Sequence, residues 1–202
     1  MKIGITKNQT YVDAIVEIHM DAFTGFFLTF LGRGFLRTLY RGFMEHPKSG
    51  IIAAVEEGKV IGFCAYSEDL SGFYKYLIRR KLPEFAWYGL GAFVRKPNVL
   101  FRLLRAFTYP EKSERKKAYM ELSSIGVSPE AENRGVGSRL VQTLCRITDA
   151  ERFAYIKLET DREGNEGANH FYQKNGFVLY HSYETPEGRK MNEYRYDLRK
   201  KR

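Results

Sequence analysis

Apolar residues in the first quarter of the chain recur three and four positions apart, which is the spacing of helices with one buried face. The residues with this spacing form two groups, Val12, Ile15, Ile18 and Ala22 in the first and Leu31, Phe35, Leu39 and Phe43 in the second. We expect the second helix to cover about residues 27–44 and to end before Pro47, because the residue before a proline disfavours helical backbone angles. A short alternating segment at residues 2–6 predicts a strand ahead of both helices.

Strand patterns dominate the next part of the chain and alternate with helices toward its end. Residues 51–55 and 60–66 have the composition of strands, and the turn residues 56–59 between them predict a hairpin. Beyond residue 117 the predicted order is strand 118–127, helix 136–150, strand 155–159, helix 165–174 and strands 177–184 and 191–198. This alternation predicts an α/β fold in which a mixed sheet carries helices on both faces.

A helical insertion is expected between the third and fourth predicted strands, at about residues 71–117. An apolar helix face recurs at residues 99–107. Pro97 and Pro83 each predict a helix start, since proline fits the first turn of a helix. The 202 residues contain no repeats, so they are expected to form one domain that carries this insertion.

The net charge of +9 is concentrated in the insertion. Residues 75–117 hold twelve Lys and Arg against three acidic residues, whereas the rest of the chain is neutral. An anionic acceptor or surface is therefore expected there. Three alternatives stay open: a lid over the site of an anionic substrate, packing helices with solvated charges, or peripheral contact with an anionic membrane through Trp87, Phe93 and Phe101. Nucleic acid is not expected as a partner, because no nucleic-acid-binding motif is present.

Cysteine spacing and hydropathy argue against several other classes of protein. Cys64 and Cys145 lie far apart without a Cys/His cluster, so the sequence predicts no metal site. The first 20 residues lack the unbroken apolar run of a signal peptide, and no apolar stretch of about 18 residues is present to span a membrane. We expect a cytoplasmic protein with reduced cysteines.

A pair of glycines lies between a predicted strand and a predicted helix, in the stretch Ile125-Gly-Val-Ser-Pro-Glu-Ala-Glu-Asn-Arg-Gly-Val-Gly-Ser-Arg139. Glycines at positions 135 and 137 let a ligand approach the backbone closely. The unpaired N–H groups at a helix start favour an anion, such as a pyrophosphate. The pair therefore predicts a phosphate-binding loop, although the same spacing occurs in ordinary turns.

Two motifs make the chain similar to the GNAT family of acetyltransferases. Residues 132–137, Glu-Asn-Arg-Gly-Val-Gly, resemble the family's acyl-CoA-binding motif Gln/Arg-x-x-Gly-x-Gly/Ala, with Glu132 in place of Gln or Arg. About 30 residues later, residues 165–177, Asn-Glu-Gly-Ala-Asn-His-Phe-Tyr-Gln-Lys-Asn-Gly-Phe, resemble the family's Asn-x-x-Ala-x-x-Phe/Leu-Tyr-x-x-x-Gly-Phe. The element order also agrees outside the insertion. The resemblance implies the GNAT fold and a metal-independent, direct transfer of acetyl from acetyl-CoA to a primary amine.

The resemblance also implies roles for single residues. Acetyl-CoA-binding roles fall to Ile125, Gly126, Val127, Asn133, Arg134, Gly135, Val136, Gly137, Ser138, Asn165, Ala168 and Phe171. Tyr172 is the candidate acid, because a tyrosine beside the sulfur has a pKa close enough to that of a thiol to protonate the leaving group. Glu159 and Glu121 are rival candidates for the base, and a base acting through water, or no protein base, stays open.

The acceptor is less well defined by the sequence. Phe23, Phe26, Phe27 and Phe30 either line the acceptor site as an aromatic wall or fill the core. A vaguer resemblance to GNAT proteins of surface-polysaccharide synthesis implies a nucleotide-linked amino sugar as acceptor, which would match the basic insertion. The alternative function is a non-catalytic acyl-CoA-binding or membrane-associated module on the same fold. His19 is expected to be a packing or hydrogen-bonding residue, and a homodimer is left open.

Overall fold

A seven-stranded sheet organises the structure, a computed structural model in which residues 1–95, 118–186 and 188–199 are described. The strand order is β1-β2-β3-β4-β5-β7-β6, and the neighbours are antiparallel except for the parallel pair β4 and β5. The strands are β1 Lys2–Thr6, β2 Ser49–Glu56, β3 Lys59–Ser67, β4 Tyr119–Val127, β5 Tyr155–Asp161, β6 Val178–Glu184 and β7 Lys190–Asp197. The predicted mixed sheet is therefore confirmed.

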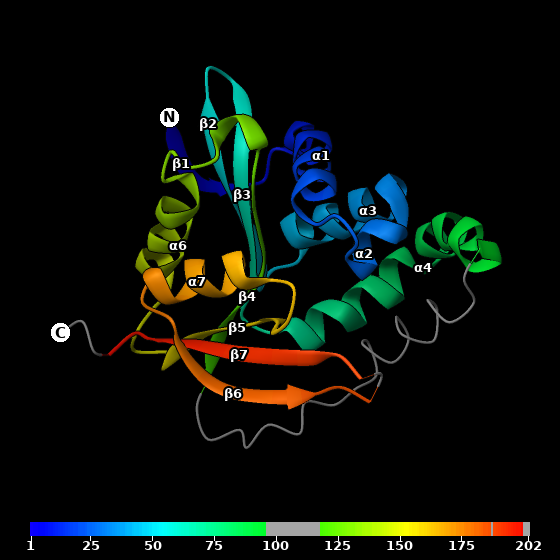
Figure 1. Ribbon diagram of the computed structural model, residues 1–202. Coiled ribbons are helices and arrows are strands. Elements are labelled where there is room, and N and C mark those ends of the chain that lie inside the picture. Colours follow the sequence, from blue (N-terminus) through cyan, green and yellow to red (C-terminus); the bar gives the residue numbers. More distant parts are fainter. Residues whose placement is uncertain (96–117, 187, 200–202) are drawn as a thin grey trace.

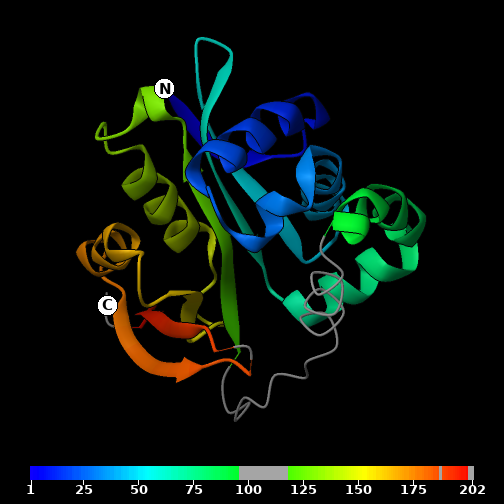
Figure 2. The ribbon, with the colours of Figure 1, turned by 45° about the vertical axis from the view of Figure 1, so that its right-hand side comes forward.

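Helices cover both faces of this sheet (Figures 1 and 2). One face carries α1 Val12–Ala22, α2 Phe27–Phe30, α3 Gly32–Glu45 and α4 Leu70–Arg95, and the other carries α6 Val136–Ile147 and α7 Glu166–Lys174. Each face has its own apolar core, one beneath α1 and α3 and one beneath α6 and α7. The amphipathic patterns of the sequence thus bury their apolar sides against opposite faces of one sheet.

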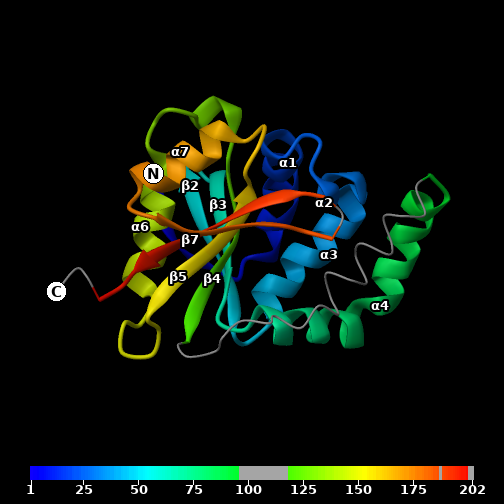
Figure 3. The same cartoon turned by 60° about the horizontal axis from the view of Figure 1, so that its bottom comes forward.

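In the middle of the sheet, β4 and β5 diverge. Their parallel pairing covers only Tyr119–Glu121 of β4 and Tyr155–Lys157 of β5. Both strands continue beyond this pairing, β4 as far as Val127 and β5 as far as Asp161. Figures 1 and 3 show the consequence: β5, β7 and β6 are turned across the direction of β2 and β3. A gap therefore opens between the two central strands.

A β-bulge in β4 lies where the divergence begins. Ala65 of β3 pairs with Ser124, whereas the next residue, Tyr66, pairs with Leu122, so Ser123 is an extra residue in β4. A bulge of this kind bends the strand and increases its local twist. It therefore helps to turn β4 away from β5.

Two predicted helix boundaries differ from the structure. The helix expected over about residues 27–44 is split into α2 and α3, because Gly32 has a φ of +82°, which a continuous helix does not allow. Pro83 lies inside α4 and does not begin a helix. The true start is at Asp69, whose carboxylate accepts a hydrogen bond from the Gly72 N–H at 2.8 Å. The helix expected at residues 99–107 lies outside the described residues.

The described half of the insertion packs firmly against α3. The rings of Phe43 and Phe73 lie 4.1 Å apart, and Lys81 of α4 lies 3.3 Å from the Glu45 carboxylate of α3. Other basic residues of α4, namely Lys75, Arg79 and Arg80, are exposed. α4 is therefore a packing helix with a basic outer side. Among the described helices, none is both long and apolar enough to cross a membrane.

We predict that Gly42→Ala destabilises the protein by about 1–3 kcal/mol, because a Cβ on Gly42 of α3 would collide with the fully buried Leu77 side chain of α4. Gly167→Ala is the matched control. This glycine is also helical but has open space around its Cβ position, so alanine should stabilise the protein by up to about 1 kcal/mol. Chemical denaturation of both variants checks the α3–α4 contact. Equal free energies of unfolding for the two variants would contradict it.

Candidate active site

The loop between β4 and α6 presents backbone N–H groups at a helix start. It includes the short 3-10 helix η2 Pro129–Ala131, and its backbone is left-handed at Asn133, with φ of +58°, and at Gly135, with φ of +74°. Arg139 donates the first hydrogen bond of α6 to the Gly135 carbonyl, at 3.1 Å. The N–H groups of residues 136–138 precede this bond and point out of the helix end. The loop is suited to an anion such as a pyrophosphate.

The two glycines of this loop serve different purposes. A Cβ on Gly135 would meet open space, so this position leaves room for a ligand. A Cβ on Gly137 would lie 3.0 Å from the Phe171 ring, so its missing side chain allows α6 and α7 to pack together. Phe171, which the resemblance placed among the acetyl-CoA-binding residues, is thus at least partly a packing residue. In this G-x-G motif the first glycine leaves space for a ligand, and the second allows two helices to pack.

The side chain of Arg134 is held by an acidic residue. Its Nη2 lies 2.7 Å from Oε2 of Glu56 at the end of β2, and this hydrogen bond lowers the pKa of the Glu56 carboxyl below its usual value. Both side chains are partly exposed. In this arrangement the Glu56 carboxylate neutralises much of the Arg134 charge, while the backbone N–H of Arg134 belongs to the loop.

The residues predicted to line the pantetheine arm lie on the diverging part of β4. Ile125 and Val127 are partly buried and pack toward the core beneath α6 and α7. Gly126 faces α1, because a Cβ there would lie 3.2 Å from Ile18 and 3.0 Å from Phe63. The β3 side of β4 is paired as far as Val127, whereas the pairing with β5 has ended. The free edge of β4 therefore faces the gap.

Tyr172 projects from α7 into the core beside β4. It is 9% exposed, and its ring lies 5.9 Å from Phe177 and 6.1 Å from Tyr194. Burial raises the pKa of Tyr172, and the nearby Cys64 thiol raises it further. Cys64 pairs across the sheet with Ile125, so Tyr172 lies close to the diverging strand. The tyrosine stays protonated at neutral pH and has a proton to give.

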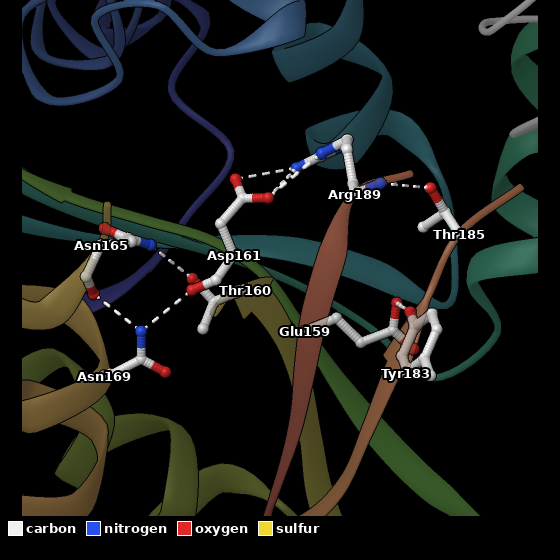
Figure 4. Close-up of polar contacts among 8 residues, drawn as sticks. All are labelled: Glu159, Thr160, Asp161, Asn165, Asn169, Tyr183, Thr185 and Arg189. Carbon is white, nitrogen blue, oxygen red and sulfur yellow. Dashed lines mark hydrogen bonds and ion pairs between the residues drawn. The ribbon is translucent and has the colours of Figure 1, made fainter. Parts of the chain in front are cut away.

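The start of α7 is tied to the end of β5 by asparagines (Figure 4). Asn165 donates from Nδ2 to Thr160 Oγ1 at 2.7 Å, and Asn169 donates from Nδ2 to the Asp161 carbonyl at 2.9 Å. Asn169 also accepts a hydrogen bond from Tyr194 through Oδ1. Asn165 immediately precedes the helix that carries Tyr172, and Ala168 lies within that helix. Sequence reasoning missed Asn169, because its partners are distant in the chain.

A charged cluster lies on the face of β5 that is turned away from Tyr172 and α7. Lys157 Nζ lies 2.9 Å from Glu159 Oε1 and 3.9 Å from Glu121 Oε2, and its side chain is only 8% exposed. Tyr183 of β6 donates a hydrogen bond to Glu159 Oε2 at 2.7 Å (Figure 4). The structure therefore brings both candidate bases together around one lysine, which sequence reasoning missed.

The α4 helix reaches this charged cluster. The pKa of Tyr74 is raised by burial and by the neighbouring Glu121 and Glu159 carboxylates. Tyr74 packs against the core beneath α1 and α3, next to Phe73. The insertion thus supplies part of the surroundings of both candidate bases.

A partly exposed ion pair between Arg189 and Asp161 stabilises the turn between β6 and β7 on the same face. Arg189 binds the Asp161 carboxylate through Nη2 and Nε, with its shortest contact at 2.7 Å, and its backbone N–H donates to Thr185 Oγ1 (Figure 4). Bidentate pairs of this kind fix geometry as well as charge. The turn is therefore anchored to the end of β5, beside Glu159.

The described phenylalanines near α1 and α2 range from packed against the core to exposed. Phe23 packs against the core and lies 4.5 Å from the His19 ring, and Phe26 contacts Phe23 edge to face at 5.5 Å. Phe30 is 55% exposed. The side chain of Phe27 lies outside the described part of the structure. In the described residues no three His, Cys, Asp or Glu side chains gather as a metal site.

We predict that Gly135→Asp weakens acetyl-CoA binding by at least about tenfold, because it adds a negative charge where the loop N–H groups face an anion. Gly188→Asp is the matched control. It adds the same charge at a glycine with a similar φ, +81°, in the turn between β6 and β7. Isothermal titration calorimetry with acetyl-CoA measures both affinities. Normal affinity for Gly135→Asp would refute the role of the loop.

Comparisons with known proteins agree with this geometry. The model of the family described as Acetyltransferase (GNAT) family matches residues 12–177. A GNAT-family protein from Desulfovibrio desulfuricans has a similar structure, with a TM-score of 0.62 and 14% identity over 98% of both chains. An N-acetyltransferase from Staphylococcus aureus Mu50 has a TM-score of 0.60 and 18% identity, also over 98% of both chains.

A structure solved with acetyl-CoA also belongs to this group. It is a protein from Bacillus anthracis, with a TM-score of 0.50 and 16% identity over 78% of this chain and 67% of that one. At these identities the structures show a common fold. None of the curated protein sequences compared with the chain matches it.

Proposed function

The chain belongs to the Acetyltransferase (GNAT) family, and we propose that it transfers acetyl directly from acetyl-CoA to a primary amine, with Tyr172 as the acid and Glu159 as the base. The supporting observation is that the two groups flank the β4–β5 gap from opposite faces of the sheet. Tyr172 shares the core beneath α6 and α7 with Leu158. Because side chains alternate along a strand, Glu159 points to the other face. The leaving group and the amine would therefore meet different residues.

The β4–α6 loop and the β4 edge are suited to acetyl-CoA. The N–H groups at the start of α6 match the charge of the pyrophosphate, and Gly135 leaves open space beside them. The free edge of β4 offers backbone hydrogen-bonding groups to the amides of the pantetheine arm. When bound there, acetyl-CoA supplies the thioester carbonyl that the amine attacks.

Tyr172 is a neutral phenol at neutral pH, and the aromatic rings around it exclude water. Burial raises the pKa of Tyr172, which by itself makes the phenol a weaker acid. The same apolar surroundings raise the pKa of a leaving thiol, which keeps the proton transfer between the two groups feasible. A thiolate formed nearby would be charged in the same apolar region, so a proton from Tyr172 neutralises it. The Asn165 and Asn169 contacts with β5 hold α7 in the position that this transfer requires.

Glu159 is better placed than Glu121 to act as base. Its side chain is 34% exposed, whereas that of Glu121 is 8% exposed. Glu159 also lies two residues beyond the last β5 residue paired with β4. Lys157 and Tyr183 each contact one of its oxygens, and a carboxylate accepts about four hydrogen bonds, so it retains capacity for an amine N–H.

For the acceptor, we propose a primary amine that carries an anionic group, as a nucleotide-linked amino sugar does. The exposed Lys75, Arg79 and Arg80 on α4 support an anionic acceptor, and Tyr74 of the same helix adjoins the candidate bases. The exposed Phe30 offers an apolar surface near α2 for a ring. Release of free thiol from acetyl-CoA tests this class against free glucosamine, a polyamine and a peptide with a free amino terminus. A preference for free glucosamine or for the polyamine, neither of which carries an anionic group, would refute the anionic acceptor.

We expect Tyr172→Phe to reduce turnover by at least about tenfold with little change in acetyl-CoA affinity, because it removes only the proton donor. Thiol release with the best amine of the panel measures turnover, and calorimetry measures affinity. Tyr196→Phe is the control and should keep its turnover, since Tyr196 is another buried tyrosine of the same core. Unchanged turnover in Tyr172→Phe would remove Tyr172 as the acid.

Glu159→Gln should lower kcat/KM for the amine by about 100-fold, since the amide accepts no proton at neutral pH. Glu121→Gln is predicted to keep activity within about threefold of the wild type, because Lys157 retains Glu159 as its closer partner. Steady-state kinetics with the same amine compares the two variants. The reverse order would assign the base to Glu121, and equal activity in both would mean that neither carboxylate is the base.

A further inference from the structure

A chain of polar side chains crosses the apolar core beneath α1 and α3. His19 of α1 lies with Nδ1 2.6 Å from the Tyr40 hydroxyl of α3, and that hydroxyl lies 3.2 Å from Ser124 Oγ of β4. His19 is 2% exposed and Tyr40 is 1% exposed, among apolar residues such as Ile15 and Phe63. The chain ends at Ser124, the residue after the β4 bulge.

The inner end of this chain carries an unsatisfied group. His19 Nε2 is buried and has no hydrogen-bond partner among the described residues. Burial lowers the pKa of His19 to about 4, so the imidazole is neutral at neutral pH. A buried polar atom without a partner costs about 1–3 kcal/mol, and an apolar residue at position 19 would avoid that cost. Core packing alone therefore does not account for a histidine at this position.

The polarity of the chain follows from the chemistry of its members. A phenol O–H is a stronger donor than an imidazole N–H, and an imidazole nitrogen is a strong acceptor, so Tyr40 donates to His19 Nδ1. The Tyr40 oxygen then accepts the Ser124 O–H. With its proton turned inward, Ser124 presents only lone pairs to the outside.

The outer end of the chain lies at the gap between β4 and β5. Ser124 comes three residues after Glu121, the last β4 residue paired with β5, and it is only partly buried. Its side chain points to the α3 side, as the Tyr40 contact requires. Lys157 and the candidate base Glu159 are on this side of the sheet too, because they alternate with Leu158 of the opposite core.

We propose that Ser124 binds the acceptor amine, and that Tyr40 and His19 are positioning residues that hold Ser124 as a pure hydrogen-bond acceptor. This inference rests on the proposed acetyl transfer and identifies where the nucleophile binds. A neutral primary amine has two N–H groups, so it donates one to Ser124 and keeps the other for the base. The nitrogen lone pair stays free for attack, and its direction is set by the hydrogen bond to Ser124.

The first test is Ser124→Ala, assayed with the best amine of the panel. The expected result is a rise of about tenfold in KM for the amine or an equal fall in kcat, with acetyl-CoA affinity within about twofold of the wild type. Ser124→Thr keeps the hydroxyl and should restore activity to within about threefold. The control is Ser123→Ala, which removes the hydroxyl of the exposed neighbouring serine. Equal kinetics in Ser124→Ala and the wild type would overturn the proposal.

The second test separates positioning from stability. Tyr40→Phe removes the link between Ser124 and His19. In the double variant Tyr40→Phe/Ser124→Ala, the change in the amine KM should be smaller than the two single changes combined, because both act through Ser124. If the hydrogen-bonded series His19–Tyr40–Ser124 is purely structural, Tyr40→Phe lowers the free energy of unfolding but leaves the amine KM of the folded variant unchanged. This outcome would overturn the positioning role. If the wild type acetylates no amine, the proposed function fails as well, whereas an active wild type with an equally active Ser124→Ala refutes only the role of Ser124.

Discussion

The parallel ladder between β4 and β5 ends after residues 119–121 and 155–157, while both strands continue without it. An inner strand normally satisfies its N–H and C=O groups on both sides, so β4 beyond this point exposes a polar edge in the middle of the sheet. The bulge at Ser123 adds the local twist that keeps the two strands apart. An extended ligand with amide groups can pair with such an edge as a strand does. The elements that carry the loop before α6, Tyr172 and Glu159 all border this one gap, and the proposed function depends on that arrangement.

The two faces of the sheet give the two groups of the proposed acetyl transfer, Tyr172 and Glu159, different environments. On the α7 side, aromatic packing raises the pKa of Tyr172 and favours a neutral proton donor. On the other side, the nearly buried ammonium of Lys157 requires anionic neighbours, and Glu121 and Glu159 supply them. A single strand separates these environments, since Leu158 and Glu159 are adjacent but face opposite ways. Strand alternation is thus sufficient to keep the proposed acid in an apolar region and the proposed base in a polar one.

Local patterns in the sequence predict the element order well, because helix and strand periodicity and the glycines depend on neighbouring residues. The glycine pair marks the loop before α6, whereas Tyr172 is a candidate only through the resemblance of residues 165–177 to a family motif. The local pattern does not find Lys157, Asn169 or Arg189, whose partners are brought near by folding and are mostly distant in the chain. The purpose of Gly137 is hidden for the same reason, since Phe171 packs against it from another helix. The helix start predicted at Pro83 is wrong because α4 begins where the Asp69 side chain caps it, well before the proline.

The position of α4 shows where the basic residues in the described part of the insertion lie relative to the candidate site. The helix is held against α3 by the Phe43–Phe73 contact and the ion pair of Lys81 with Glu45, so its first turns are fixed relative to the sheet. Its inward side contributes Tyr74 beside the candidate bases, a group without charge at neutral pH. The exposed bases of α4 are on the solvent side and act on a ligand at a longer range, which salt screens. The described part of the insertion therefore combines an uncharged inner side next to Glu121 and Glu159 with a basic outer surface, and this combination is the reason for proposing an anionic acceptor.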